Sequence, residues 1–388
     1  MQKKKVLHII DSFGTGGAET WLLACVKYLY SHPELNVQFD FLASGGKTGV
    51  HDDEIKKYGS EIFYAKYSLQ KIFVFGRELK KILRGHGYCA IHNHTDFVSG
   101  WHFLSAAGSL PAIRVAHVHN PWNFVNNYVV NPFRWFSFRM GRLLTALLTT
   151  KITGTSDAVL DEYGYNKWPF KKKRVMPAYC GFDVEKFLYD ETAKKKMCDE
   201  MGWDYNCRIG LFAGRIGLHN YDKAINQKNP SFALSVAREL VKNSKEWNFI
   251  FAGYKGIQGW QMENELKAEG LSNRIKFMGL RNDLPSIMSA SEIIIFPSLW
   301  EGLGMVAVEA QAAGLPVLAS DTVPEEAIVC DEIYFKKRLS EGALSWVKGI
   351  NSITSSHFLH RDEYNKYVLQ SRFSINASVN YLLSLYQA

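Results

Sequence analysis

The sequence predicts an α/β protein built from two doubly wound domains, and three observations support this. The chain has 388 residues, which is too long for one ordinary domain. Short apolar segments alternate with helix-like segments along nearly its whole length, as in a parallel sheet covered by helices on both faces. This alternation starts again after a basic stretch near residue 181. We therefore expect two Rossmann-like domains that face each other across a ligand cleft.

The first predicted domain covers residues 1–181 and begins with a strand, a glycine-rich turn and a helix. The segment "KKKVLHIID" predicts the strand, and "SFGTGGAETWLLACVKYLYSHPE" predicts the turn and an amphipathic helix. Further strands are predicted at "NVQFDFLASGG", "CAIHNHT" and "AIRVAHVHN". Because helix-like sequence separates these strands, the sheet is expected to be parallel.

The second predicted domain covers residues 182–362, and a helical segment at 363–388 is expected to pack back on the first domain. The boundary lies in the basic stretch Lys171–Phe187, which contains Pro177 and Gly181. Five strands are predicted at "RIGLFAGR", "NFIFAGY", "RIKFMGL", "EIIIFPS" and "LPVLAS". A turn follows each of them, and a helix follows most.

Composition narrows the classes of protein and partner. The six cysteines are scattered without a C-x-x-C pair, so we expect reduced thiols in a cytoplasmic protein. Nowhere do about 20 apolar residues run together, so no transmembrane helix is expected. The net charge of +8 permits nucleic acid, an anionic membrane surface or phosphorylated ligands as partners. Since no nucleic-acid-binding motif occurs, we expect no nucleic acid partner.

The glycine-rich turn at Gly14–Glu19 lies where a phosphate-binding turn belongs. It does not match the dinucleotide fingerprint G-x-G-x-x-G, because Glu19 occupies the third glycine position. Gly16 and Gly17 would still let a ligand approach the backbone N–H groups at the start of a helix. The alternative is a tight turn that binds nothing.

Four histidines lie at the ends of two predicted strands, where the ligand crevice of an open α/β sheet is found. They are His92, His94, His117 and His119. No carboxylate or thiol accompanies them at a metal-ligand spacing, so we expect no metal. For each histidine, a packed and hydrogen-bonded role and a ligand contact both remain open.

Arg215 follows a predicted strand, and Lys228 precedes a predicted helix. Two fixed cations beside a crevice would suit a diphosphate, because they compensate the negative charge that grows on a leaving group. The alternative is a pair of ordinary surface cations.

The segment "EGLGMVAVEAQAAG" predicts a glycine-rich turn followed by a helix that ends at Gly314. The free N–H groups of Leu303, Gly304, Met305 and Val306 could hold phosphate oxygens. Glu301 lies before this helix, where it could accept hydrogen bonds from sugar hydroxyls. Glu309 lies inside the helix, where a charge without partners would be costly, and two vicinal ribose hydroxyls would satisfy both of its oxygens. Alternatively, one glutamate caps the helix and the other is exposed.

Taken together, these motifs resemble the family 4 glycosyltransferases of GT-B fold, and most closely the bacterial capsule and exopolysaccharide branch. They are "GTGGAE", "AHVHN", "AGR" with "QKNPSF", "FMGLRNDLPSIMSASEIIIFPS" and "EGLGMVAVEAQAAGLPVLASD". The resemblance covers nearly the whole chain, in the order found in the family. It implies a retaining, metal-independent, hexosyl-type transferase that moves a sugar from a UDP or GDP sugar to a growing lipid-linked oligosaccharide.

The resemblance also implies roles for single residues. Arg215 and Lys228 match the pair that stabilises the diphosphate, Glu301 the carboxylate at the donor sugar, and Glu309 the ribose contact. His119 matches the histidine near the reacting sugar.

By the same resemblance, Gly16 and Gly17 match the loop that approaches the donor phosphates and the acceptor. The backbone at Leu280 and Arg281 matches the turn that binds the base. The first domain would then bind the acceptor and the second the nucleotide sugar. Retention in this family is explained without a protein base, the leaving phosphate taking the acceptor proton on the same face.

The chain departs from the family pattern at two places. Twelve residues, "IGLHNYDKAINQ", separate Arg215 from Lys228, so Lys223 is a competing candidate for the lysine. Gly304 stands where this branch often has proline. Two other functions are open alternatives: a GT-B sugar-nucleotide epimerase or hydrolase, and a non-catalytic subunit that binds a sugar nucleotide.

The segment "NPFRWFSFRMGRLLTALLTTK" mixes aromatic and apolar residues with arginines and a lysine. A basic amphipathic helix of this kind can lie on an anionic membrane surface. An ordinary core helix beside the cleft is the alternative. Because capsule-pathway relatives extend lipid-linked sugars, we expect a protein that is peripheral at the inner face of the plasma membrane.

Overall fold

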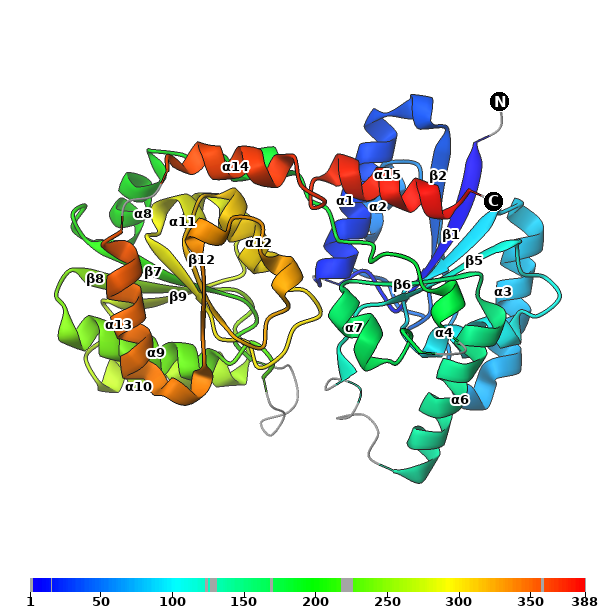
Figure 1. Cartoon of the computed structure of the whole chain (residues 1–388), viewed down its shortest axis with the longest axis horizontal. Helices are drawn as coiled ribbons and strands as arrows, with labels where there is room; N and C mark the ends of the chain where they lie inside the picture. Colours follow the sequence, from blue (N-terminus) through cyan, green and yellow to red (C-terminus); the bar gives the residue numbers. More distant parts are fainter. Residues whose placement is uncertain are drawn as a thin grey trace. The chain divides into compact units, whose positions relative to one another are not determined.

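The computed structural model describes residues 3–14, 16–122, 125, 131–167, 170–217, 226–356 and 359–387. The chain divides into two compact α/β units (Figure 1). The N-terminal unit contains Met1–Phe182 together with Arg372–Ala388, and the C-terminal unit contains Asp183–Ser371. The predicted segment 363–388 therefore includes the end of the C-terminal unit as well as the helix that returns to the N-terminal unit.

In the described part of the N-terminal unit, parallel strands form one six-stranded sheet with the order β3-β2-β1-β4-β5-β6. The strands are β1 (Lys4–Ile10), β2 (Val37–Ala43), β3 (Ile62–Tyr64), β4 (Ala90–Asn93), β5 (Ile113–Val118) and β6 (Lys151–Gly154). The helices are α1 (Gly17–Ser31), α2 (Asp52–Lys57), α3 (Ile72–His86), α4 (Val98–Ser105), α6 (Pro132–Leu148), α7 (Asp157–Glu162) and α15 (Ile375–Leu385).

The two faces of this sheet differ in chemistry because successive strand residues point to opposite sides. Leu7, Ile9 and Ile91 face an apolar core that α3 and α4 cover. His8 and His92 lie opposite each other on β1 and β4 and face the other side. There Tyr386, just after α15, packs against both rings, and Trp21 of α1 packs against His117 of β5. One face is thus mainly apolar, apart from the buried pair Asn93 and His102, and the other carries a buried layer of histidines.

The C-terminal unit repeats this architecture, with a described six-stranded parallel sheet of order β12-β11-β10-β7-β8-β9. The strands are β7 (Arg208–Ala213), β8 (Trp247–Ala252), β9 (Ile275–Gly279), β10 (Ile293–Phe296), β11 (Val317–Ser320) and β12 (Tyr334–Lys337). The helices are α8 (Ala193–Met201), α9 (Pro230–Asn243), α10 (Ile257–Ala268), α11 (Leu284–Ala290), α12 (Met305–Ala312), α13 (Gly342–Thr354) and α14 (Arg361–Leu369). The predicted α/β architecture is confirmed.

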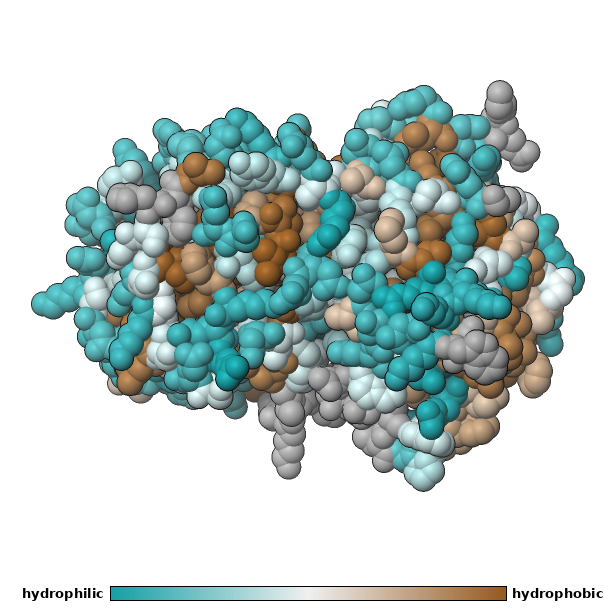
Figure 2. Space-filling view, viewed as in Figure 1, coloured by the Kyte–Doolittle hydropathy of each residue, from teal (hydrophilic) through white to brown (hydrophobic). Residues whose placement is uncertain are grey.

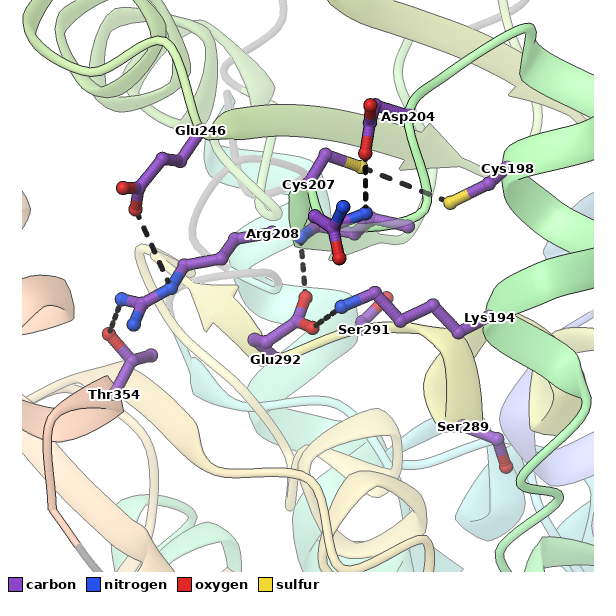
Figure 3. A network of polar contacts seen from close by, with 12 residues as sticks. Lys194, Cys198, Asp204, Cys207, Arg208, Glu246, Ser289, Ser291, Glu292 and Thr354 are labelled. Atoms are coloured by element: carbon purple, nitrogen blue, oxygen red, sulfur yellow. Dashed lines mark hydrogen bonds and ion pairs between the residues drawn. The ribbon is translucent and has the colours of Figure 1, made fainter.

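A polar network ties α8 to the amino ends of β7 and β10 in the C-terminal unit (Figure 3). Glu292, before β10, pairs with Lys194 of α8 and accepts a hydrogen bond from the backbone N–H of Ile209. Arg208 of β7 reaches Thr354 at the end of α13, with 3.4 Å between Nη1 and Oγ1. This network lies at the strand ends opposite to those that carry Arg215 and Glu301, so its role is structural.

Gly314 ends α12 and is pressed against the start of α14. Its φ of +60° is left-handed, and an added Cβ would lie 2.6 Å from Cα of Arg361. The Arg361 guanidinium in turn donates to the carbonyls of Gly314, Ser289 and Ser291. Glycine at 314 is therefore required both by backbone conformation and by close packing.

We predict that Gly314→Ala destabilises the protein far more than Gly202→Ala. Gly202 also has a left-handed φ, +69°, but an added Cβ would meet nothing within 4 Å. The Gly202 variant should lose only the conformational term, about 1 kcal/mol. The Gly314 variant should lose about 2 kcal/mol more through overpacking. Urea unfolding of both variants measures this difference, and equal losses would contradict it.

Candidate active site

Both units place their predicted site residues where parallel strands end. In the N-terminal unit, Gly16, Gly17 and His119 follow β1 and β5. In the C-terminal unit, Arg215 follows β7 and Glu301 follows β10. Carboxyl ends of neighbouring parallel strands meet at one edge of a sheet, which is where ligands bind in open α/β folds. Each group is described within its own unit.

Glu301 forms a buried ion pair with Lys228 in the C-terminal unit. Their Oε1 and Nζ atoms are 2.6 Å apart, and Glu301 is only 7% exposed. Ser298 Oγ donates to the same carboxylate oxygen at 2.6 Å, and Gln227 Nε2 donates to the other at 3.3 Å. A buried carboxylate needs such partners, since an unpaired charge is costly away from water. The structure thus brings together Lys228 and Glu301, two residues predicted separately.

Two loops hold this pair in place. The backbone carbonyl of Gln227 accepts from Leu299 N–H at 2.8 Å, and its side-chain amide donates to the carbonyl of Trp300 at 2.9 Å. Asn229 adopts a left-handed φ of 53°, and α9 begins at Pro230. Lys228 therefore lies on a fixed turn directly before a helix, as the sequence predicts. Lys223, the competing candidate, lies outside the described residues.

Glu309 lies on α12, close enough to Lys228 for an electrostatic interaction. Burial raises the pKa of Glu309 to about 7, and the positive charge of Lys228 opposes this increase. Among the residues that the structure describes, none donates a hydrogen bond to its carboxylate. The predicted internal position is confirmed, and the carboxylate has open acceptor sites.

The helix that carries Glu309 begins with an uncapped N-terminus. Gly304 is its N-cap and has a φ of 98°, and no side chain caps the first turn. Proline could not adopt this φ, so the departure from the family pattern has a structural reason. The first helical N–H groups, those of Met305 and Val306, have no intrahelical acceptor and can hold an anion.

The two predicted arginines of the C-terminal unit differ in whether their side chains have partners among the described residues. Arg215 is exposed, and its guanidinium makes no hydrogen bond or ion pair to a described residue. Arg281, in contrast, donates to Asp283 at 2.7 Å and pairs with Glu200. Leu280 beside it is 64% exposed. Arg215 thus has no partner for its charge among the described residues, whereas the side chain of Arg281 is engaged. The base contact expected from the backbone at Leu280 and Arg281 stays a prediction.

In the N-terminal unit, histidine side chains form a layer against the buried side of the sheet. His94 stacks on His92 with ring centroids 4.3 Å apart, and His119 stacks on His117 at 4.0 Å. His8, which the sequence reading did not select, joins them. Burial lowers the pKa of His8 and of His119 to about 3, and lowers the others well below their ordinary value. All five rings are therefore neutral at pH 7.

Two of these histidine triads have ring nitrogens within 4.8 Å of one another, which makes them the candidate metal ligands of the described chain. They are His8, His92 and His94, and His94, His117 and His119. A bound metal lies near the plane of each imidazole that ligates it. His8 and His94 are 13° from parallel, and His117 and His119 are 14° from parallel. Such stacked rings do not converge on one ion unless they rotate.

His119 is held through both its backbone and its side chain. Asp96 accepts a hydrogen bond from the His119 backbone N–H at 2.7 Å, and Asp96 itself has a left-handed φ of 50°. In the side chain, Nε2 of His119 lies 2.9 Å from Nδ1 of His94. Trp21 packs against it, with its indole N–H donating to Ser378 of α15.

Gly16 and Gly17 are exposed at the start of α1, which has no side-chain cap. A Cβ at Gly16 would lie 2.3 Å from a carboxylate oxygen of Glu19, whereas a Cβ at Gly17 would meet nothing within 4 Å. The turn is therefore open to a ligand at Gly17, and glycine at 16 leaves room for Glu19.

Sequence reasoning missed residues that support the site from behind. Ser298 and Gln227 carry a weak signal, since one follows a strand and the other precedes Lys228. Asp96 follows "HNHT" directly. Nothing in the sequence around His8 indicates a site residue, because a single histidine inside an apolar strand is expected to be part of the core.

The chain matches two sequence families that together cover most of its length. Residues 15–186 match "Glycosyltransferase Family 4". Residues 218–368 match "Glycosyl transferases group 1".

Curated relatives match along most of this chain. The putative glycosyltransferase EpsF of Bacillus subtilis is 27% identical over 387 residues, 99% of this chain and 96% of EpsF. The capsular polysaccharide biosynthesis glycosyltransferase CapH of Staphylococcus aureus is 26% identical, covering 99% of each chain. An Escherichia coli UDP-Gal:alpha-D-GlcNAc-diphosphoundecaprenol alpha-1,3-galactosyltransferase is 25% identical, covering 76% of this chain and 75% of that protein.

A solved structure shares the fold at lower sequence identity. Anabaena HepE in complex with UDP superposes with a TM-score of 0.75 at 16% identity, covering 98% of both chains. Such a likeness concerns the fold alone. With two Rossmann-like units and both family matches, the chain belongs to the family 4 glycosyltransferases of GT-B fold.

Proposed function

We propose that this glycosyltransferase moves a hexosyl group from a nucleotide-diphosphate sugar to a lipid-linked oligosaccharide, without a metal and with retention of configuration. The observation that carries the proposal is the cluster at the carboxyl ends of β7 and β10. It combines the paired cation Lys228 with the cation Arg215 and the carboxylate of Glu309, which have no hydrogen-bond or ion-pair partner for their side chains among the described residues. These groups match the diphosphate and the ribose of a sugar nucleotide.

The donor diphosphate would be held by positive charge rather than by a metal. Arg215 supplies a guanidinium that pairs with no described residue, and Lys228 has ammonium protons beyond the one that Glu301 accepts. The uncapped N-terminus of α12 adds backbone N–H groups and the positive end of a helix dipole. Because the fold holds Lys228 and the helix end in place, their charge would stabilise the leaving diphosphate with little reorganisation.

Two relatives support the chemical class of donor and acceptor. HepE has been solved with UDP and with UDP-glucose, which favours a UDP sugar over a GDP sugar here. The name of the E. coli relative specifies a sugar linked to diphosphoundecaprenol as its acceptor. We infer a lipid-linked saccharide acceptor in surface polysaccharide biosynthesis, in line with the capsular relative.

The site residues also support retention without a protein base. An imidazole with a pKa near 3, as in His119, is a weak base at neutral pH. The carboxylate of Glu301 is engaged by Lys228 and Ser298. In the proposed step, the acceptor oxygen bonds to the anomeric carbon as the bond from that carbon to the phosphate oxygen breaks. The acceptor proton passes to the leaving phosphate oxygen, so the protein orients the partners and stabilises charge.

Helix α6 is the proposed membrane contact. Phe138, Gly141 and Thr145 are buried on the face that packs closely against α4. The opposite side exposes a band of large apolar residues, and apolar surface appears beside polar surface in this part of the N-terminal unit (Figure 2). The exposed residues are Phe133, Trp135, Phe136, Leu143 and Leu147.

Cations accompany this band. The guanidinium of Arg139 lies 4.7 Å from the ring of Trp135, and Arg134 lies in the first turn of α6. Among the described residues, no helix is both long enough and apolar enough to cross a bilayer. Aromatic rings flanked by arginines suit insertion into the headgroup region of an anionic bilayer, where a lipid-linked acceptor is found. One face of α6 is therefore core, as the second alternative predicts, and the described residues leave the other face exposed, which supports the proposed contact.

Transfer should occur in EDTA and depend on Glu301. With labelled sugar nucleotides and a lipid extract, label should enter the lipid fraction, and Glu301→Gln should lower this rate about 100-fold by removing a fixed charge at the donor sugar. Glu292→Gln is the matched control, because Glu292 pairs with Lys194 at the opposite end of the sheet. Loss of transfer in EDTA, or equal effects of both variants, would contradict the proposal.

Donor affinity should rise with pH through about 7. Burial holds the pKa of Glu309 near 7, so in the free protein the carboxylate is mostly protonated at pH 6 and mostly ionised at pH 8. If ribose hydroxyls bind the ionised form, affinity should increase about tenfold between these values. Calorimetric titration with the sugar nucleotide measures it. Glu309→Gln should bind weakly at both pH values, and an unchanged tenfold dependence in this variant would refute the assignment.

Vesicle binding should depend on the exposed aromatics of α6. Replacing Trp135 and Phe136 by serine should reduce affinity for vesicles containing anionic lipid about tenfold or more, because burial of each ring in the interface is lost. Trp260→Ser serves as control, since Trp260 is 56% exposed on the C-terminal unit. Co-sedimentation measures binding, and a similar loss in the control would argue against α6.

A further inference from the structure

Three histidines of the N-terminal unit form a hydrogen-bonded chain that leads from the interior of the sheet to His119. Nδ1 of His8 lies 2.9 Å from Nε2 of His94, and Nδ1 of His94 lies 2.9 Å from Nε2 of His119. His8 is fully buried in β1, and His94 directly follows β4. The chain therefore connects a side chain that no substrate can reach with the histidine assigned to the reacting sugar.

Counting protons shows that the three rings are coupled. Because the rings are neutral, each carries one ring proton shared between two nitrogens. His94 has one proton and two hydrogen-bonded neighbours, so it must donate to one and accept from the other. If His94 reverses, both neighbours must reverse with it to keep the two bonds. The tautomers of all three rings can change only together.

The two ends of the chain differ in their surroundings. At the inner end, Nε2 of His8 is buried without a hydrogen-bond partner among the described residues. At the outer end, Nδ1 of His119 has no partner in the described part of the chain. The proton position at the inner end thus decides whether His119 presents an N–H donor or a lone pair. Asp96 fixes the backbone of the same residue, so its position and its protonation pattern are both set by the fold.

We propose that His8 and His94 are positioning residues for His119, which they hold in a single tautomer so that its outer nitrogen meets the donor sugar in one hydrogen-bonding role. This inference rests on the proposed function, in which His119 contacts the reacting sugar. His8 and His94 touch no substrate in this account. An isolated neutral imidazole can carry its proton on either nitrogen, and the hydrogen-bonded neighbours restrict His119 to one of these tautomers. The other tautomer would present the wrong group to the sugar.

The hydrogen-bonded chain of histidines can be observed directly in the unmodified protein. With ¹⁵N-labelled histidine, NMR should show scalar coupling across both N–H···N bonds, and His119 should give one protonated and one unprotonated nitrogen. Averaged nitrogen signals for His119, or no coupling between its Nε2 and Nδ1 of His94, would overturn the proposal. This readout needs no substrate, so it stands or fails separately from transfer activity.

A pair of variants at His8 then tests whether the inner end controls the outer one. His8→Leu removes the bond to His94, whereas His8→Asn places an amide near the position of Nδ1 and can retain it. We expect His119 to lose its single tautomer in His8→Leu and to keep it in His8→Asn. His102→Leu is the control, because His102 is equally buried in the same unit and bonds to Asn93 outside the chain.

Kinetics of the same variants separates positioning from general loss of structure. His8→Leu should lower kcat about tenfold with the donor KM nearly unchanged, as expected when a reacting group is misplaced. His8→Asn should recover most of this loss, and His102→Leu should stay near wild type. If His8→Leu keeps full kcat, or if His8→Asn and His102→Leu lose as much, the positioning role is refuted. Where the wild-type protein transfers no sugar at all, the proposed function fails, while the NMR result still decides the chain.

Discussion

The buried ion pair between Lys228 and Glu301 is the constraint on which the rest of the C-terminal unit's site depends. A carboxylate that is 7% exposed remains charged only if its partners are fixed in place. Ser298, Gln227 and Lys228 supply those partners from two loops. The same requirement fixes the start of α9, and it sets a positive charge beside Glu309, whose carboxylate is left open. The contacts that stabilise the ion pair are therefore the same contacts that set the geometry of the proposed donor site.

In the N-terminal unit, the buried histidine layer beside the sheet is uncharged. Its neutral rings need hydrogen bonds but no counter-charge. Burial keeps them neutral, and edge-to-face packing against Trp21 and Tyr386 fills the space between the sheet and the helices. One unit therefore concentrates charge that suits a diphosphate, and the other carries a layer of uncharged histidine rings, among them His119, the proposed contact of the reacting sugar. A transferase that relies on orientation and electrostatics needs both kinds of surface.

The sequence predicted the elements that have a strong apolar periodicity or that are bounded by glycine or proline. The segment from Glu301 to Gly314 was readable because glycines mark both ends of its helix. Strands β3, β6 and β12 were not predicted, since each is a short strand at the edge of its sheet and owes its conformation to pairing with one neighbour. His8, Ser298 and Gln227 join the site through contacts between distant segments. Such contacts leave no local pattern, so His8 in its apolar strand looked like any core position.

The central claim is that Lys228 and Glu301 act as one unit in sugar transfer. A double-mutant cycle on the rate of transfer tests it, using Lys228→Met, Glu301→Gln and the double variant with the donor that the wild-type protein accepts. We expect strong non-additivity: the double variant should be little slower than the worse single variant, with a coupling of at least about 1.4 kcal/mol. Additive effects would show that the two side chains contribute independently and would refute their joint role.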